Sequence, residues 1–209
     1  MKEQQKKYEL TDEFIEFGSG KKLYRIRALV AFGAVVAGQP GGFVESEKNL
    51  DQSLSGNAWV SGNAWVYGNA QVYGNAQVYG NAQVYGNAQV YGNAQVYGNA
   101  WVYGNAWVYG NARVYGNAWV YGNARVRSYA VISDKKMIFW ASNVGSENGT
   151  LTVFNGEDGL IVTRGCFTGT VNVFLAKSAE VHDDKTKNEY KLLIEVAKSR
   201  ILGVKDERN

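Results

Sequence analysis

The chain has one cysteine and one histidine among its 209 residues. A single cysteine excludes an internal disulfide framework and a cysteine-based zinc site, and a single histidine excludes a histidine-rich metal site. No apolar run reaches the roughly 18 residues of a membrane span, and Met1–Lys7 is not followed by the apolar core of a signal peptide. The net charge of +3 is too small a surplus to favour nucleic acid as a partner. We therefore expect a cytoplasmic protein that uses no metal, no cofactor and no membrane.

An internal repeat dominates the middle of the chain. From residue 56 to residue 127, twelve consecutive hexads read Gly-Asn-Ala-x-Val-Tyr, and only the x position and the last position vary. The same phase extends into degenerate hexads on both sides, at Ala28/Val30, Ala34/Val36, Leu54 and Ala130/Ile132, with an insertion near residues 39–53. The constant phase favours an ordered structure over a low-complexity tract that is disordered or amyloid-forming.

A six-residue period with one aliphatic residue fits a short strand followed by a corner. In Ala-x-Val-Tyr, alternation directs Ala and Val to one face of the strand and x and Tyr to the other. Gly and Asn both tolerate the left-handed backbone region, so Gly-Asn is expected to make the corner. Three strands and three corners then close a coil of 18 residues, and successive coils stack about 4.8 Å apart with valine inside.

These hexads resemble the hexapeptide-repeat left-handed parallel β-helix family, which pairs an aliphatic residue with small and polar ones, as in Val-Tyr-Gly-Asn-Ala-Gln. The left hand is implied by this resemblance alone. The fold class is therefore expected to be mainly β: a three-sided β-helix with 18 residues per coil, followed by a small α+β domain. The expected division is N-terminal cap strands at 1–27, the β-helix at 28–133 and the C-terminal domain at 134–209. The regular repeats also resemble uncharacterised bacterial and prophage proteins, which implies a phage or mobile-element origin.

Positions 18 apart are expected to stack into columns on the outside of the coil. The predicted oligomer face is aromatic and consists of Trp65, Trp101, Trp119, Tyr67, Tyr85, Tyr103 and Tyr121. The block from residue 56 to residue 126 holds no acidic residue and only two basic ones, Arg113 and Arg125. Large uncharged aromatic patches are typical of contact surfaces. Three alternatives remain: stacking along the axis that only stiffens the coil, self-association with a trimer favoured, and a platform for sugars or bases.

The flanking segments lack the repeat. Leu10–Phe17 and Lys22–Arg27 predict two strands around Gly18–Gly20 that cap the open end of the coil. Three strands are predicted at residues 137–144, 150–154 and 160–163, joined by glycine-bearing turns. Helical spacing follows at 171–181 and 190–201, with Thr186–Glu189 as a capping box and Gly203 as the stop. The C-terminal domain is thus expected to be βββαα.

Candidate binding residues lie in that domain. The turn with Ser146 and Asn148 offers polar groups that could hold a phosphate or nucleotide together with Arg164, while Trp140 could stack on a base. A simple hairpin turn and a core tryptophan are the competing interpretations. Cys166 could pair with His182 as a nucleophile, although a buried small residue beneath a helix is the favoured interpretation.

The main functional hypothesis is a non-enzymatic scaffold, in which an oligomerising β-helix displays C-terminal domains that capture a host protein or a small nucleotide-like ligand, with an anti-defence role. A structural part of a virion or fibre is the first alternative. The second is a hexapeptide acyltransferase, which the resemblance implies, but the coils hold no histidine to serve as the family's usual catalytic base. No catalytic residue is assigned.

Overall fold

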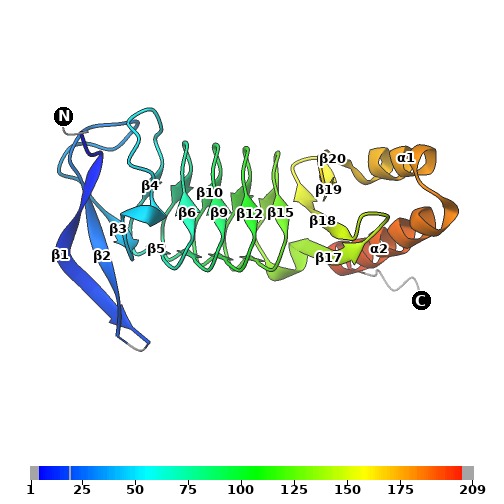
Figure 1. Cartoon of the computed structure of the whole chain (residues 1–209), viewed down its shortest axis with the longest axis horizontal. Helices are drawn as coiled ribbons and strands as arrows, with labels where there is room; N and C mark the ends of the chain where they lie inside the picture. Colours follow the sequence, from blue (N-terminus) through cyan, green and yellow to red (C-terminus); the bar gives the residue numbers. More distant parts are fainter. Residues whose placement is uncertain (1–4, 19, 204–209) are drawn as a thin grey trace.

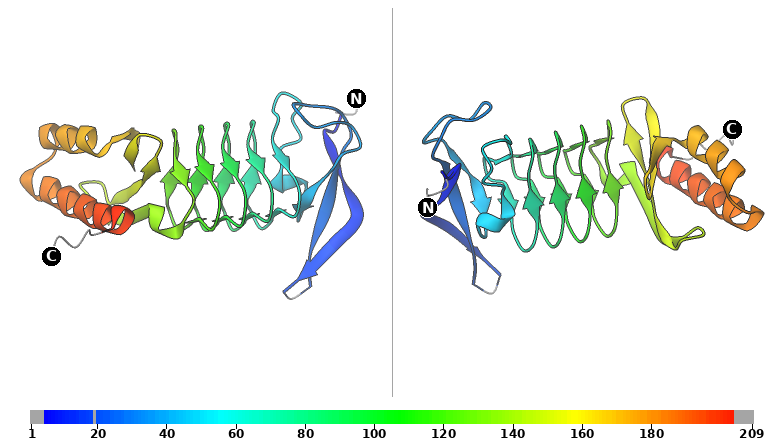
Figure 2. Two further views of the ribbon diagram at one scale, coloured as in Figure 1. Left: turned by 180° about the vertical axis from the view of Figure 1, so that it is seen from behind. Right: turned by 45° about the horizontal axis from the view of Figure 1, so that its top comes forward.

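The computed structural model describes residues 5–18 and 20–203. The molecule is elongated, with stacked coils in the middle, a long hairpin at the N-terminal end and a sheet with two helices at the C-terminal end (Figures 1 and 2). Ser19 of the predicted hairpin turn lies outside the described residues, as do residues 1–4 and 204–209.

The coils form a three-sided parallel β-solenoid of short strands. The first face contains β5 (Trp65–Val66), β8 (Gln83–Val84), β11 (Trp101–Val102) and β14 (Trp119–Val120). The second contains β4 (Trp59–Val60), β7 (Gln77–Val78), β10 (Gln95–Val96), β13 (Arg113–Val114) and β16 (Val131–Ile132). The third contains β6 (Gln71–Val72), β9 (Gln89–Val90), β12 (Trp107–Val108) and β15 (Arg125–Val126). Each strand pairs with the strand one coil away in parallel, so the predicted 18-residue coil is confirmed. The left hand stays a prediction.

The repeat alanines and valines fill the interior of the solenoid. From Val78 to Val126, every alanine and valine of the hexads has an exposed fraction of 0%. The predicted inward face is therefore confirmed. Because small side chains repeat at fixed positions, the core has the same content at every level, and its energy accumulates through contacts between neighbouring coils.

At the corners, the backbone conformation of asparagine differs from the prediction. The corner glycines from Gly62 to Gly122 adopt the left-handed region, as at Gly92 (φ 70°), but no asparagine of the hexads has a positive φ among the described residues. Their side chains instead form ladders along the axis: Asn69 Nδ2 donates to Asn87 Oδ1 at 3.0 Å, and Asn87 Nδ2 donates to Asn105 Oδ1 at 3.0 Å. Asparagine thus serves hydrogen bonding between coils, because its amide is both donor and acceptor.

The N-terminal segment closes one end of the solenoid. β1 (Tyr8–Phe17) and β2 (Lys21–Ala28) form the predicted antiparallel hairpin, and β2 also pairs with β3 (Pro40–Val44). β3 then pairs in parallel with β5, so the segment predicted as an insertion supplies the first strand of the first face. A short 3-10 turn, η1 (Glu47–Asn49), follows it.

The degenerate hexads predicted before residue 56 differ from the structure. Phe32 and Val35 bridge within a small antiparallel loop, while Val36 and Leu54 are exposed. The buried partner of Val72 is Leu50 rather than Leu54. The loop around residues 51–55 shifts the phase by four residues, which spacing alone could not reveal.

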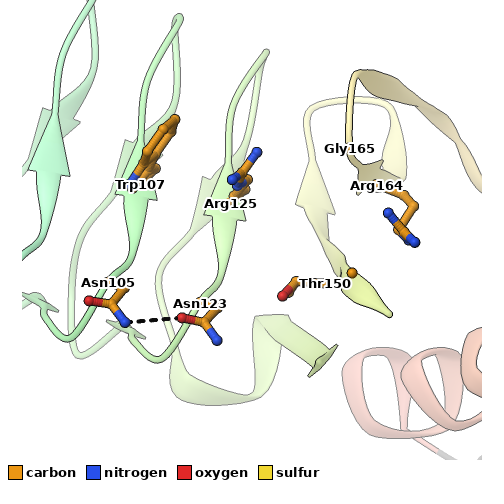
Figure 3. Close-up of a pocket in the computed structure, with 8 residues that line it drawn as sticks. Asn105, Trp107, Asn123, Arg125, Thr150, Arg164 and Gly165 are labelled. Atoms are coloured by element: carbon orange, nitrogen blue, oxygen red, sulfur yellow. Dashed lines mark hydrogen bonds between the residues drawn. The ribbon is translucent and has the colours of Figure 1, made fainter. Parts of the chain in front are cut away.

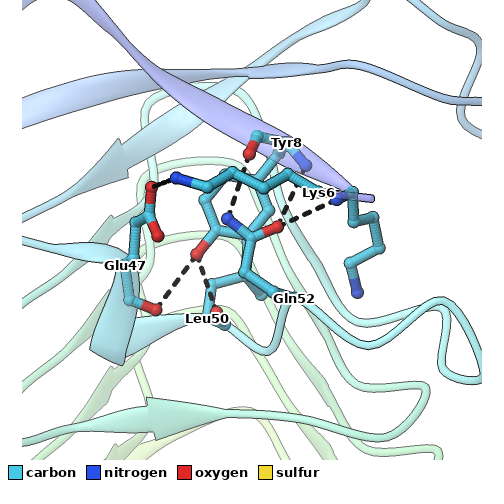
Figure 4. A network of polar contacts seen from close by, with 6 residues as sticks. Lys6, Tyr8, Glu47, Leu50 and Gln52 are labelled. Carbon is cyan, nitrogen blue, oxygen red and sulfur yellow. Dashed lines mark hydrogen bonds and ion pairs between the residues drawn. The ribbon is translucent and has the colours of Figure 1, made fainter. Parts of the chain in front are cut away.

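A polar network fixes the first coil against the hairpin (Figure 4). The Tyr8 hydroxyl donates to the Leu50 carbonyl at 2.7 Å, and the side chain of Gln52 bonds the backbone N–H and C=O of Tyr8, taking the place of a paired strand. Lys6 forms an ion pair with Glu47 at 2.7 Å. Burial, with the charges of Glu47 and Asp51, raises the pKa of Tyr8, so this phenol stays protonated.

The C-terminal domain is an antiparallel sheet of four strands followed by two helices. Its strands are β17 (Ile138–Val144), β18 (Gly149–Gly156), β19 (Gly159–Arg164) and β20 (Phe167–Thr170), preceded by a 3-10 turn, η2 (Lys135–Met137). The prediction of three strands therefore missed β20, whose sequence Phe-Thr-Gly-Thr is short and contains glycine. The helices are α1 (Val171–Val181) and α2 (Asp184–Leu202).

The helix ends confirm one predicted cap and correct another. Gly203 follows α2 with φ 76°, as predicted. The N-cap of α2 is Asp183 rather than Thr186: the Asp183 carboxylate accepts from the Thr186 N–H at 2.8 Å, so the helix begins at Asp184. Hydrogen bonds from Thr186 lower the pKa of Asp183. An aspartate at this position satisfies an otherwise free backbone donor and complements the helix dipole.

The last coil and the C-terminal sheet share one core and several hydrogen bonds. Ile138 and Phe154 belong to the same buried cluster as the repeat valines. Thr163 Oγ1 donates to the Arg125 carbonyl at 2.7 Å, and the Arg125 N–H donates to Thr152 Oγ1 at 3.1 Å. The domain therefore continues the solenoid without a free linker.

Candidate binding site

The four predicted binding residues do not converge. Ser146 and Arg164 line a pocket of the C-terminal domain, whereas Asn148 (φ 48°) belongs to the β17–β18 turn and does not line it. Trp140 lies elsewhere, packed edge-to-face on Tyr121 with ring centroids 4.2 Å apart. Trp140 thus covers the end of an aromatic column, and the structure does not bring it to the other three residues.

We name the hollow between the 146–147 turn, the β19–β20 turn, α1 and α2 the C-terminal pocket. Its volume is about 310 Å³. Phe167, Phe174 and Tyr190 form its aromatic wall, with Phe174 packed against both other rings at centroid distances of 5.3 and 5.1 Å. Lys177 and Arg164 provide positive charge, and Glu147 provides the opposing negative charge at the turn. An apolar wall with a few polar groups is typical of a small-molecule site.

Two polar atoms at this pocket are buried without a hydrogen-bond partner. They are Ser178 Oγ and His182 Nδ1, and the Ser178 side chain belongs to a residue only 4% exposed. Buried hydroxyl and imidazole groups nearly always have partners, because an unsatisfied one costs about 1–3 kcal/mol. Sequence reasoning missed Ser178, since a serine on the inner face of an amphipathic helix looks like an ordinary small core residue.

The structure brings Cys166 and His182 to the same pocket. Cys166 is exposed, so the expectation of a small residue buried beneath a helix is wrong: the β19–β20 turn carries the thiol out to solvent. Among the described residues, no hydrogen bond joins the two side chains, and His182 Nδ1 has no partner that would orient the ring. A nucleophile–base pair requires such orientation, so this geometry favours binding over nucleophilic catalysis.

Arg164 forms the wall between the C-terminal pocket and a second hollow. Its Nε donates to the Tyr190 hydroxyl at 3.0 Å and its Nη2 donates to the Val144 carbonyl at 3.3 Å. Gly149 faces this guanidinium, and any Cβ at that position would collide with it. A side chain at this position would therefore require the Arg164 guanidinium to move.

We name the second hollow the junction groove, because it lies where the last coils meet the C-terminal sheet (Figure 3). Its volume is about 400 Å³. Trp107 and Arg125 come from the third face of the solenoid, and Thr150 and Arg164 come from β18 and β19. The groove shares Arg164 and Gly165 with the C-terminal pocket, so the two hollows adjoin.

The aromatic columns consist of rings stacked on one another. Tyr85 and Tyr103 are stacked at 5.0 Å with an angle of 3° between their planes, and Trp101 and Trp119 are stacked at 5.2 Å. Of the predicted oligomer face, Tyr121 is the most open residue at 37% exposed, and the other members are half-buried. The predicted columns are confirmed, and axial stacking accounts for much of their apolar surface.

Comparison with known proteins supports the repeat architecture. Segments 70–86, 88–104, 94–110 and 106–122 match the family described as YdcK Beta solenoid repeat. None of the curated proteins matches the chain. The chain is thus similar to β-solenoid repeat proteins over the middle of its solenoid, and the flanking segments have no counterpart in that match.

Two general properties bear on the choice of function. No helix of the described residues has both the length and the apolar character needed to cross a membrane. Within the same residues, no group of three or more His, Cys, Asp or Glu side chains is placed to hold a metal ion.

Proposed function

We propose that the protein is a rigid, non-enzymatic scaffold whose solenoid positions a small-molecule-binding C-terminal domain. The observation that carries this proposal is the pair of unsatisfied buried atoms, Ser178 Oγ and His182 Nδ1, at an apolar pocket. Both atoms are covered in this conformation, so the Ser178 and His182 side chains would have to rotate toward a ligand. A ligand with a hydrogen-bonding edge would then satisfy both atoms, while its apolar part would cover the aromatic wall.

Continuity of the solenoid with its flanks supports the scaffold role. The hairpin segment adds β3 beside β5 of the first coil, and Thr152 and Thr163 of the C-terminal sheet bond the backbone of Arg125 in the last coil, so part of the backbone at each end is occupied. Trp59, on an outward position of the first coil, is only 2% exposed because Tyr8 and Phe32 pack on it. Covered ends do not favour end-to-end stacking, which a fibre built from coils would need. The virion or fibre alternative is therefore the weaker proposal.

Self-association and a host target remain part of the proposal. The uncharged aromatic faces support a homo-oligomer, with a trimer favoured by the family resemblance. Light scattering tests it, and a monomer at every concentration would overturn it. The prophage resemblance adds that the captured molecule is a host protein or a nucleotide-like signal whose capture blocks a host defence. Capture experiments with host extract test that step.

The pocket is tested by native mass spectrometry of the protein purified without denaturation. We expect a retained small molecule that is lost in Ser178→Phe, because the new ring fills the pocket. The matched control is Ala179→Phe, which places the same ring on the exposed side of α1 and should retain the ligand. Thermal unfolding of both variants reports whether they fold. The proposal would be overturned if a folded Ser178→Phe variant retained the ligand. It would also be overturned if the wild-type protein carried no ligand and no added metabolite protected Cys166 from thiol reagents.

The spacer role is tested by deleting one coil, residues 86–103. Columns repeat at a separation of 18 residues, so this deletion rejoins every column in register. We expect the rod to shorten by about 4.8 Å in small-angle scattering, with unchanged ligand retention. Loss of the ligand in the folded deletion variant would show that the coils do more than set distance.

A further inference from the structure

Three arginines near the junction groove lack a carboxylate partner. Arg125, Arg127 and Arg164 form no ion pair among the described residues. Arg113 differs, because its guanidinium pairs with Glu157 at 2.7 Å. The repeat around them provides no acid, since residues 56–126 hold no aspartate or glutamate. The positive charge at the junction is therefore not neutralised by the neighbouring coils.

The three guanidiniums are held in place by other contacts. Arg125 lies over the Trp107 ring at 4.6 Å, and Arg164 is fixed by the Tyr190 hydroxyl and the Val144 carbonyl. Arg127 Nη2 donates to the Cys166 carbonyl at 2.8 Å, while its Nε is buried without an acceptor. A pre-positioned guanidinium loses little conformational entropy when it binds an anion.

The neutral polar groups of the groove satisfy one another. Asn105 Nδ2 donates to Asn123 Oδ1 at 3.2 Å, Asn123 Nδ2 donates to Ser142 Oγ at 3.4 Å, and Ser142 and Thr150 share a hydrogen bond at 3.0 Å. Figure 3 shows Asn105 and Asn123 joined along one side of the groove, with Arg125 and Arg164 at other positions around it. The hydrogen-bond donors of the groove that remain free are therefore those of its arginine guanidinium groups.

We propose that the junction groove binds an oxyanion, of the phosphate type, carried by a ligand whose apolar part occupies the C-terminal pocket. Arg125 and Arg164 contact the oxyanion, because guanidinium groups form strong charge-assisted hydrogen bonds with phosphate oxygens. The shared residues Arg164 and Gly165 make the two hollows continuous for one amphipathic molecule. This inference rests on the proposed function for the apolar part of the ligand and extends the site onto the solenoid.

Cys166 provides the reporter for the test, because it is the only cysteine, is exposed and lines the C-terminal pocket. Its thiolate is reacted with two aromatic disulfides, the anionic 5,5′-dithiobis(2-nitrobenzoate) and the neutral 4,4′-dithiodipyridine. In each reaction the thiolate attacks one sulfur, a mixed disulfide forms and the aryl thiol leaves as the measured chromophore. The ratio of the two rates reports recruitment of the anionic probe, because a change in the thiol itself affects both reactions.

The decisive variant is Arg125→Gln, which inserts the residue that Gln71 and Gln89 already place in the same column. We expect the rate ratio to fall about fivefold. Inorganic pyrophosphate should slow the anionic probe in the wild type and not in the variant. Arg113→Gln is the matched control, since it removes the same charge from the same repeat position and should leave the ratio unchanged. An equal fall in both variants, or no effect of pyrophosphate on the wild type, would overturn the oxyanion site.

The two proposals fail in different ways. If the neutral probe reacts without saturation while the anionic probe keeps its dependence on Arg125, the apolar C-terminal pocket fails as a site and the oxyanion site stands. If both probes saturate and Arg125→Gln changes neither, the pocket stands and the junction groove takes no oxyanion.

Discussion

The solenoid and the C-terminal domain differ in how their polar side chains are paired. In the solenoid, each corner asparagine has an identical neighbour one coil away, so the amides pair along ladders. In the C-terminal domain, Thr168, Ser178 and His182 each hold a buried polar atom without a partner. Repetition thus pairs the exposed corner amides with one another, although Trp59 Nε1 in the first hexad is also buried without a partner. Open groups are the ones that a ligand can satisfy, and three of them lie in the C-terminal domain.

We expect the largest effect on stability from a charged side chain placed inside the solenoid. Val84→Asp buries a carboxylate at a position with 0% exposure and no cation within the valine column. We expect a loss of about 4 kcal/mol or more in the free energy of unfolding, measured by urea denaturation. Val196→Asp on α2 is the control, because its parent side chain is 48% exposed, and it should cost less than about 1 kcal/mol. Similar losses in the free energy of unfolding for both variants would contradict a solenoid core that excludes water.

The tyrosine columns should make the solenoid sensitive to alkali. Burial, reinforced by the charge of Tyr85, raises the pKa of Tyr67 to about 12. Burial, with the charges of Tyr109 and Tyr73, also raises the pKa of Tyr91 to about 12, although Arg125 and Arg127 act in the opposite direction. Unfolded tyrosine titrates near pH 10. Below pH 10 both states keep their protons and the full stability is present. Between about pH 10 and 12 the unfolded chain loses its protons first, so stability falls as pH rises.

Circular dichroism and tyrosinate absorbance, recorded together across this range, measure the effect. Both signals should change in one transition above pH 10, and Tyr67→Phe should make the loss of stability less steep. Tyrosines that titrate freely near pH 10 while the β signal is unchanged would argue that the columns are open to solvent.

The repeat made the solenoid predictable. Twelve copies of one hexad define the phase of the core, so the inward valines, the 18-residue coil and the outward columns all follow from spacing. The role of asparagine was not predictable from local propensity, because the ladders exist only between coils. The same reason hid the strand at Pro40–Val44, which pairs with Trp65–Val66 although it has no hexad pattern of its own.

The candidate site was predictable only in part. Ser146 follows from the composition of its turn and Arg164 from its place beside a predicted strand, and both line the C-terminal pocket. Phe174, Ser178 and Tyr190 come from helices and were predicted only as members of helical faces or not at all. Arg125 was counted as one of two charges on the columns, and nothing in its hexad indicates that the C-terminal sheet folds beside it. Sites between two elements depend on tertiary contacts, and a single sequence does not reveal those contacts.

The backbone offers a similar test, because the corners of the solenoid are closely packed while a turn outside it is open. Gly92→Ala places a Cβ 3.0 Å from the backbone nitrogen of Gly110, in addition to the strain of φ 70°. Gly38→Ala has a similar conformation (φ 84°) with nothing within 4 Å of the new Cβ. We expect about 1–2 kcal/mol of destabilisation at Gly38 and about 1 kcal/mol more at Gly92, measured by chemical denaturation. Equal costs would mean that neighbouring coils can separate locally to admit a methyl group.

The smallest effects should distinguish satisfied from open hydroxyl groups. Thr163→Val removes a hydroxyl that donates to the Arg125 carbonyl at 2.7 Å, and it should lower stability by about 1 kcal/mol. Ser178→Ala removes a buried hydroxyl without a partner. It should raise the free energy of unfolding of the unliganded protein by up to about 1 kcal/mol, which would appear as a slightly higher unfolding temperature. The same Ser178→Ala variant should retain less ligand in native mass spectrometry, so stability and binding move in opposite directions. A variant that loses stability without ligand would mean that Ser178 supports the helix packing, and the case for an open site in the domain would lose its main support.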